Sequence, residues 1–584
     1  MRSSAAVERV DVTCALLLVL GLLTHVGLII GDSVDDAYIS FRYAANLAHG
    51  HGLVFNPGEW VEGYSNLTWV LLTAAFVRAG VHPDLGMRWV ALLCLVATVV
   101  VVMITLARVT GSRVASLAAA LVLVTSSMWI AASVNGLEGG LFSLLLIVVV
   151  ALGTRLWRSD SLALSVGLSL AGVVLAMTRP EGCLLFLAYL VTSGAAWWVR
   201  ARATARSRRF HALLLTGGAF AVGVLGLLAW RLATYGSTVP NTVIAKIGPD
   251  GSAGIRLLSG LGVWYLLGFA LSTWYLWLAL AYALVAVARG RNVEGLLTFG
   301  PGLILPLAGA VVALANRGDW MPHYRLMAPY VPVLVMSIVG LLASSSPSSR
   351  RAVWPGAALA TLALVGGPSY SELHPIAPRF LWETPGPGLW GQLGQSLEEA
   401  RAPWVRPRFA TEVLGRFSYY APGTTIIDLN GLTDSVIARH EPAVAQFGRR
   451  TRPDTLRALG PDVIAFNDLS YWRTLLSTGW FAAEYVPLSC DVLLSAEIYA
   501  FVRREAAFRL ERIALCPHPT LTDHEAFRRA MCLRTRTWRY DFPRECREQR
   551  DGRTAHAVGD ERTPSRVRAG HDRVRAAAAA RSCT

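Results

Sequence analysis

Two adjacent carboxylates, Asp35 and Asp36, follow the first long apolar stretch of the sequence. Neighbouring negative charges repel each other, which raises the pKa of one carboxyl group and suits the pair to accept a proton or to hold a divalent cation. Tyr38, just downstream, is expected on a helix at a membrane surface. The alternative is structural, because aspartate is also favoured at the N-cap of a helix.

A second polar cluster contains Asp319, His323 and Arg325, where two apolar stretches meet. The planar guanidinium group of Arg325 is suited to paired hydrogen bonds with a phosphate, and we predict that it binds the phosphate of a lipid. A basic residue beside a membrane can instead extend its side chain to the interface without binding a ligand.

Lys246 is the single lysine among the 54 lysine and arginine residues of the chain. A composition that favours arginine so strongly is expected to keep a lysine where a compact point charge is needed, although chance retention accounts for it equally well. Lys246 and Arg179 are therefore candidates to complete a phosphate clamp with Arg325. The alternative for both is a surface charge.

Two glutamates stand at predicted helix starts, where the helix dipole stabilises a carboxylate. Glu138 follows Gly136, and its role as a helix cap is favoured over a catalytic one. Glu181 follows Pro180 and is equally suited to a cap, or to a pair with Arg179 that shapes a site.

The elements that position these residues are membrane helices. Hydrophobic residues make up 54% of the 584 residues and charged residues 16%, which is typical of a membrane bundle rather than of a soluble domain. The apolar blocks match the length needed to cross about 30 Å of hydrocarbon. The net charge of +15 is explained by arginines in short loops and in the C-terminal tail, so nucleic acid is excluded as a partner.

We predict about eleven membrane spans and a mainly α-helical fold. The predicted spans are residues 12–30, 87–107, 114–133, 141–156, 162–178, 184–199, 212–233, 262–288, 296–314, 327–342 and 353–365. The apolar segment 67–77 is too short to cross unaided and is expected to be interfacial or re-entrant.

Loop charges set the predicted orientation. With the N-terminus inside, the arginine-rich loops 108–113, 155–158, 200–209, 289–291 and 350–351 all fall in the cytoplasm, as the positive-inside rule requires. The polar residues introduced above then gather on the extracytoplasmic face. Ionisable groups near membrane depth are costly and usually functional, so we expect them to line a cavity that opens outward.

Three domains are predicted. Residues 1–366 form the transmembrane bundle, with a first outer loop at 32–66. Residues 367–505 alternate short β-like runs with helical stretches and form a small extracytoplasmic α/β domain. Residues 506–584 are a basic extension that is partly disordered.

The long stretch after the first span resembles a known family. Residues 35–42, 46–59 and 62–66 resemble the first extracytoplasmic loop of the GT-C glycosyltransferases that use polyprenyl-phosphate sugars. They are most similar to the actinobacterial terminal β-(1→2)-arabinofuranosyltransferases. The segments 135–138, 178–182, 235–246, 318–325 and 427–434 resemble the same family or its relatives, and the resemblance covers about the first 470 residues.

The resemblance implies an activity and a site. It implies a multi-pass enzyme of the plasma membrane that transfers arabinofuranose from decaprenyl-phosphoryl-arabinose to a cell-wall glycan such as arabinogalactan. It implies catalysis by Asp35 and Asp36, with a divalent cation as a possible ligand of that pair. The residues implied in binding the donor phosphate or the substrate are Arg325, Lys246, Arg179, His323, Asp319, Tyr38, Arg42, Glu138, Glu181 and Asn241.

Other functions stay open. A mannosyl- or other hexosyltransferase would share the same geometry. A lipid or glycan transporter would also place charges in the membrane, but inverted repeats are expected of a transporter and the sequence shows none. A scaffold for other cell-wall enzymes would leave Asp35, Asp36 and Arg325 without a reason to share a cavity.

Overall fold

The computed structural model describes residues 2–29, 33–159, 161–200, 203–247, 260–290, 292–319, 321–345, 387–400, 406–444, 448–467, 469–489, 493, 498–505 and 520–521. These residues form two compact units. The first, which is helical, takes its described residues from 2–345 and 430–450. The second, which contains a six-stranded sheet, takes them from 387–429 and 451–521.

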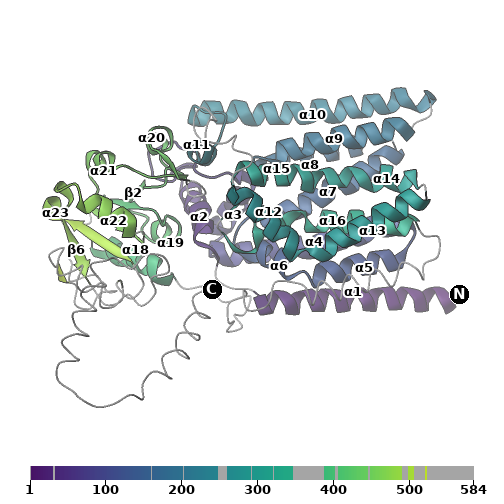
Figure 1. Cartoon of the computed structure of the whole chain (residues 1–584), viewed down its shortest axis with the longest axis horizontal. Helices are drawn as coiled ribbons and strands as arrows, with labels where there is room; N and C mark the ends of the chain where they lie inside the picture. The colour runs from purple at the N-terminus through teal and green to yellow at the C-terminus, as the bar shows by residue number, and fades with distance from the viewer. Residues whose placement is uncertain are drawn as a thin grey trace, which may run out of the picture. The chain divides into compact units, whose positions relative to one another are not determined.

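Long helices run side by side through the first unit, and Figure 1 shows short helices gathered at one end of them. The helices of this unit are α1 Arg2–Ile29, α2 Asp35–Ala48, α3 Leu67–Arg78, α4 Pro83–Thr110, α5 Arg113–Val124, α6 Ser127–Val134, α7 Gly139–Ser159, α8 Leu162–Thr178, α9 Gly182–Arg200, α10 Ala203–Tyr235, α11 Asn241–Ile247, α12 Gly260–Ser272, α13 Trp274–Gly290, α14 Val293–Phe299, η1 Gly300–Leu303, α15 Ile304–Ala315, η2 Pro322–Tyr324, η3 Ala328–Tyr330, α16 Val331–Ser345 and α20 Ser435–His440.

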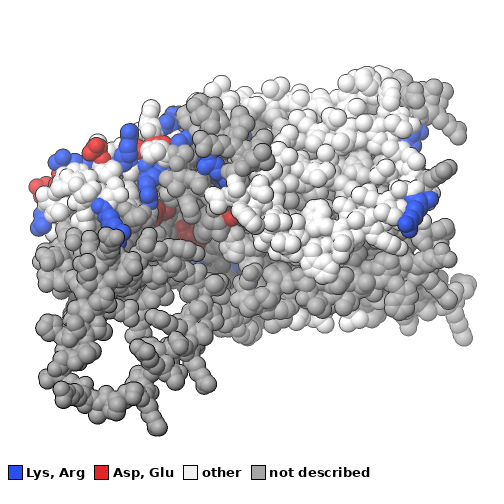
Figure 2. All heavy atoms as spheres, viewed as in Figure 1, with Lys and Arg blue, Asp and Glu red and all other residues white. Residues whose placement is uncertain are grey.

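The first unit is a multi-pass membrane bundle, as predicted. Within the described residues, six helical stretches are long and apolar enough to cross a membrane, or up to eight if each of two bent helix pairs is one span. The predicted total of eleven stays a prediction, and its last span, residues 353–365, lies outside the described residues. The flank of the bundle visible in Figure 2 is almost bare of charged side chains, as a lipid-facing surface should be.

Two of the predicted spans are bent. Helices α5 and α6 meet at 61°, and helices α12 and α13 meet at 77°. The first bend leaves carbonyl groups at the end of α5 without helical partners. His25 of α1 compensates, because its ring Nδ1 lies 2.7 Å from the carbonyl oxygen of Val124 and its Nε2 lies 3.2 Å from the Ser127 hydroxyl.

The second unit is a small α/β domain, also as predicted. Its sheet has the order β2-β1-β5-β7-β6-β8, in which β2, β1 and β5 are parallel and the other pairs antiparallel. The strands are β1 Arg408–Thr411, β2 Thr425–Asp428, β5 Val463–Phe466, β6 Tyr485–Ser489, β7 Tyr499–Arg503 and β8 Thr520–Leu521. The helices are α18 Gly388–Ala400, α19 Gly415–Tyr419, α21 Pro453–Leu459, α22 Leu469–Leu476 and α23 Trp480–Glu484.

A late segment of the chain belongs to the first unit. Residues 430–450 carry α20 and the strand pair β3 Ala443–Val444 and β4 Gly448–Arg449. The side-chain amide of Asn241, in α11, donates to the carbonyl oxygens of Gly431 at 2.9 Å and Leu432 at 3.0 Å. Arg449 donates to the carbonyl oxygen of Ile244 at 3.1 Å. The helical unit is therefore discontinuous in sequence. The predicted domain boundary at residues 366–367 lies outside the described residues.

A buried ion pair anchors the start of α2. Asp84 and Arg88, in the first turns of α4, are 0% and 1% exposed, and two nitrogen–oxygen distances of 3.2 Å join them. The hydroxyl of Ser33 donates to Asp84, and the hydroxyl of Tyr38 lies 3.5 Å from it. This network holds both ends of the segment that carries Asp36.

We expect Asp84→Ala and Arg88→Ala each to lower the free energy of unfolding by about 3–5 kcal/mol, because each leaves one buried charge without its partner. The double variant should lose much less than the sum of the two. Thermal unfolding in detergent measures all three. Additive losses would show that the two charges do not stabilise each other.

Candidate active site

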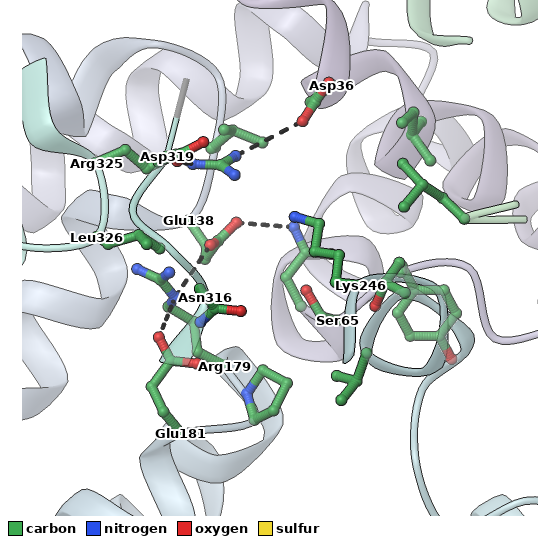
Figure 3. Close-up of a pocket in the computed structure, with 18 of the residues that line it drawn as sticks. Asp36, Ser65, Glu138, Arg179, Glu181, Lys246, Asn316, Asp319, Arg325 and Leu326 are labelled. Carbon is green, nitrogen blue, oxygen red and sulfur yellow. Dashed lines mark hydrogen bonds and ion pairs between the residues drawn. The ribbon is translucent and has the colours of Figure 1, made fainter. Parts of the chain in front are cut away.

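A cavity of about 250 Å³ lies in the first unit, at the end where the short helices gather. Typical pockets for larger organic ligands measure roughly 300–1,000 Å³, so this one suits a small polar group. Figure 3 shows that it is lined by charged side chains from separate segments of the chain. The charged residues that line it are Asp36, Glu138, Arg179, Glu181, Lys246, Asp319 and Arg325.

Helix α2 presents only one carboxylate of its acidic pair to the cavity. Asp36, Ile39 and Ser40 lie on the same face of the helix, and all three line the cavity. Asp35 does not line it. The Asp36 side chain is 30% exposed. Burial raises the pKa of Asp36 above its usual range, although Arg325 and Lys246 act in the opposite direction.

Arg325 joins two carboxylates. Its Nε lies 2.5 Å from Oδ2 of Asp319, and its Nη1 lies 3.7 Å from Oδ2 of Asp36 (Figure 3). Burial opposes ionisation of Asp319, but Arg325 and Lys246 outweigh it and hold the pKa of Asp319 below its usual range. Asp319 is therefore a fixed counter-ion, and Asp36 is the carboxylate at the weaker end of the bridge.

An unusual backbone presents Arg325. His323 and Tyr324 have φ angles of 63° and 49°, a region that residues other than glycine rarely adopt. The Tyr265 hydroxyl accepts a hydrogen bond of 3.0 Å from the backbone N–H of Leu326, which ties the segment to α12. Strained backbone of this kind concentrates at functional sites.

Arg179 stands in the turn between α8 and α9 with two carboxylates beside it. Its Nε lies 2.8 Å from Glu181 and 3.6 Å from Glu138 (Figure 3), and its guanidinium carbon lies 5.1 Å from the centre of the Phe142 ring. Glu181 is thus paired with Arg179, one of the two predicted roles. The positive charge of Arg179 is compensated within the protein.

Glu138 is held by neutral groups as well. The side-chain amide of Asn66 donates to its Oε2 at 2.9 Å, and the hydroxyl of Ser40 donates to Asn66 at 3.1 Å. The indole N–H of Trp69 donates to the carbonyl oxygen of Gly136 at 3.0 Å, which fixes the turn before Glu138. Sequence analysis assigned Asn66 no role, because its link to Glu138 exists only once α3 and the 136–138 turn are packed together.

Lys246 has no ion-pair partner among the residues that the structure describes. It stands on α11 and reaches the cavity, and among the described residues no carboxylate lies within ion-pair distance of its ammonium group and no hydrogen bond engages it. Burial lowers the pKa of Lys246, and Arg325 lowers it further. A bound anion would restore the balance.

The remaining predicted site residues do not line the cavity. Tyr38 is fully buried beside Asp84. Arg42 donates to the carbonyl oxygen of Phe55 at 2.8 Å and so fixes the loop after α2. Asn241 holds residues 430–450, as described above. His323 belongs to the strained segment before Arg325 and is not part of the cavity wall.

The cavity offers a poor set of ligands for a metal ion. Among the described residues, no three histidine, cysteine, aspartate or glutamate side chains converge on one point. Asp35, the partner proposed for Asp36 in such a site, does not line the cavity, and Asp319 is bound to Arg325. The residues present therefore do not fit the divalent cation that the resemblance allows.

Fold and cavity together define a class: a multi-pass membrane protein with a small, strongly charged cavity at one end of its helices. The chain is similar to a terminal β-(1→2)-arabinofuranosyltransferase of Corynebacterium glutamicum, with 28% identity over 333 residues, which are 52% of this chain and 47% of that protein. A protein of the same description from Mycobacterium tuberculosis is 28% identical over 236 residues, 36% of this chain and 34% of that protein.

The chain thus matches about half or less of the length of these curated relatives. The predicted resemblance to the terminal arabinofuranosyltransferases is confirmed. No family model matches the chain. Among solved structures, ArnT from Cupriavidus metallidurans bound to undecaprenyl phosphate aligns with a TM-score of 0.40 and 13% identity, over 86% of this chain and 99% of that one.

A second buried ion pair supports the loop beside the cavity. Glu62 and Arg231 are 2% and 5% exposed, and 2.9 Å separates their Oε1 and Nε atoms. The next residues, Gly63 and Tyr64, line the cavity. Burial raises the pKa of Glu62 to about 7, although Arg231 opposes the shift.

We expect this carboxyl to make stability depend on pH. Between its ordinary pKa of 4.5 and about 7, folded Glu62 keeps a proton that the unfolded chain has lost, so the free energy of unfolding falls as the pH rises through that range. Glu62→Gln should remove up to about 3 kcal/mol of this dependence. Melting temperatures at pH 5 and pH 8 measure it. Glu59→Gln, an exposed position of the same loop, should keep the wild-type slope; a Glu62→Gln slope equal to wild type would contradict the assignment.

Proposed function

We propose that the protein is a glycosyltransferase of the plasma membrane that moves a sugar from a polyprenyl-phosphate donor to a cell-wall glycan. The sugar we infer is arabinofuranose, from the relatives named above, and the working face is the extracytoplasmic one, from the loop charges. One observation carries the proposal: the cavity brings together the carboxylate Asp36 and two cations, Arg325 at 3.7 Å from it and Lys246, which forms no ion pair with any described residue.

The two cations suit a leaving phosphate. When the bond between the sugar C1 and the phosphate oxygen breaks, the polyprenyl phosphate departs with an additional negative charge. Positive groups already held in place lower the free energy of that state, because they need no reorganisation as the charge develops. Lys246 supplies a point charge, and Arg325 supplies directed N–H donors. Arg325 and Arg179 each have two carboxylates beside them, so charge compensation does not separate them. We favour Arg325 because it adjoins Asp36, the carboxylate that we assign to the reaction.

Asp36 is suited to receive the acceptor proton. The acceptor hydroxyl oxygen forms the new bond to C1, and its proton passes to the carboxylate. A carboxyl whose pKa is raised by burial is a stronger base than an ordinary one. A negative group at this place also stabilises positive charge on the sugar ring as the bond breaks. The anomeric configuration of the product, measured by NMR, distinguishes direct inversion from net retention.

The rival functions differ from this one in what they need from the cavity. A hexosyltransferase would use the same charges with another sugar. A lipid or glycan transporter would bind the same phosphate but would need no base. The α/β domain is the proposed binding site of the acceptor glycan.

We expect Asp36→Asn to reduce sugar transfer at least 100-fold, the range typical of a lost general base. Asp35→Asn, the matched control one residue away, should keep most of the activity because Asp35 does not line the cavity. The measurement is transfer from synthetic polyprenyl-phosphoryl-arabinose to a short arabinan by purified proteins with equal melting temperatures.

Other outcomes of this assay reassign the function. Full activity of Asp36→Asn would remove this carboxylate from the mechanism. Transfer from a mannosyl donor alone would change the sugar and keep the reaction class. Binding of lipid-linked sugars without transfer of any of them would favour a transporter.

We expect Lys246→Met to weaken inhibition by free polyprenyl phosphate roughly 10-fold, in line with the loss of one charged hydrogen bond. Lys246 lowers the pKa of Asp36, so its removal should raise that pKa. In the pH profile of kcat/KM, the acid limb, where activity falls as Asp36 is protonated, should therefore move to higher pH. Lys246→Arg should restore the limb in part. Arg78→Met, an exposed charge at the end of α3, serves as the control. An acid limb of Lys246→Met at the same pH as in wild type would show that Lys246 does not influence the ionisation of Asp36.

A further inference from the structure

Two polar atoms of residues that line the cavity have no hydrogen-bond partner in the part of the chain that the structure describes. The hydroxyl oxygen of Thr242 and Nη1 of Arg179 are shielded from solvent, and neither forms a hydrogen bond to any described residue. Arg179 as a whole is 7% exposed. Buried polar groups without partners are rare in folded proteins and destabilise them, so each calls for an explanation. A ligand in the cavity is one.

Asn316 and Ser65 add two more groups on residues that line the cavity. The amide nitrogen of Asn316 donates to the carbonyl oxygen of Val312 at 3.0 Å, which fixes the orientation of the amide and leaves Oδ1 as an acceptor. Figure 3 shows Asn316 and Ser65 on opposite sides of the part of the cavity below Lys246. The Ser65 hydroxyl is partly exposed and forms no hydrogen bond within the described part of the chain.

Other neutral groups of the cavity are already occupied. Ser40 donates to Asn66, and Asn66 donates to Glu138. Besides the charged ends of Asp36 and Lys246, four described groups of the cavity residues therefore keep free hydrogen-bonding capacity: those of Ser65, Arg179, Thr242 and Asn316. They combine a donor on Arg179, an acceptor on Asn316 and two hydroxyls that do both.

This combination does not suit a phosphate. A phosphate dianion only accepts hydrogen bonds, so Oδ1 of Asn316 would repel it. Glu181 and Glu138 beside Arg179 make this side of the cavity negative. Sugar hydroxyls, in contrast, donate and accept at once, and they carry no charge.

We propose that Ser65, Arg179, Thr242 and Asn316 bind the hydroxyl groups of the transferred sugar and so determine which sugar the enzyme accepts. This inference rests on the proposed function. It divides the cavity in two: Lys246 and Arg325 hold the phosphate, and these four residues, the sugar wall, hold the ring. Arg179 thereby moves from the predicted phosphate clamp to sugar recognition.

The sharpest test is Thr242→Val. It replaces an unpartnered hydroxyl by a methyl group of similar shape, so the apo protein should be as stable as wild type or more so. Catalysis should nevertheless suffer, with kcat/KM for the full donor reduced roughly 10- to 100-fold. If Thr242 were merely structural, the variant would instead lose stability and keep its kcat/KM. Ser237→Ala, in an exposed loop outside the cavity, is the control for loss of a hydroxyl.

Donor analogues allow a double-mutant cycle in which one change is made in the protein and the other in the sugar. Wild type, Thr242→Val and Asn316→Ala are each assayed with lipid-linked arabinose and with its 2-, 3- and 5-deoxy analogues. For at least one analogue, the loss caused by the missing sugar hydroxyl should largely disappear in a variant that lacks its partner. If the loss from each variant and the loss from each deoxy analogue simply multiplied in every combination, the sugar wall would be overturned. Transfer by wild type in the same assay would still support the proposed function. Failure of wild type to transfer any lipid-linked sugar would overturn both.

Discussion

Charge balance in a confined space is the constraint on which this structure depends. Seven charged side chains of the described residues share one small cavity beside the apolar part of a membrane bundle. Unpaired charge is costly where water is scarce, so most of these groups lie beside an opposite charge. Asp319 and Arg325 pair within one loop, and the charge of Arg179 is balanced by Glu181 in its own turn and by Glu138 from another segment. The remaining two are Asp36, which lies 3.7 Å from Arg325, and Lys246, which forms no ion pair with any described residue.

The pairs that lie outside the cavity serve the same balance indirectly. Asp84 and Arg88 fix the entry into α2, and Glu62 and Arg231 fix the loop that follows it. Both pairs are almost inaccessible to solvent, so neither is placed to meet a substrate. They hold the backbone on either side of Asp36 at defined points. Asp36 pairs only weakly with Arg325. It can nevertheless keep its position, because the backbone on both sides of it is fixed.

The apolar blocks and the loop charges are enough to predict that the polar segments gather at one end of the helices, where the cavity lies. Sequence analysis could also have separated Asp36 from its neighbours. Asp36, Ile39 and Ser40 share a helical face, whereas Asp35, Tyr38 and Arg42 share the other; the single helix period of α2 therefore decides which residues reach the cavity. The contact of Asn66 with Glu138 and the role proposed for Asn316 could not be predicted in this way. They depend on contacts between segments far apart in the chain, and an asparagine alone does not reveal which of its two polar ends is already engaged.

The insertion of residues 430–450 into the helical unit has a consequence for the order of assembly. Leu432 belongs to the cavity wall, and Asn241 of α11 is held by backbone carbonyls of the same segment. The ribosome finishes α16 about a hundred residues before it reaches Arg450. Through that interval, the segment that supplies Leu432 to the cavity wall and carbonyl acceptors to Asn241 has not yet been made. The cavity wall therefore cannot be complete until residues 430–450 have joined the helices, and a chain cut after α16 would lack part of it.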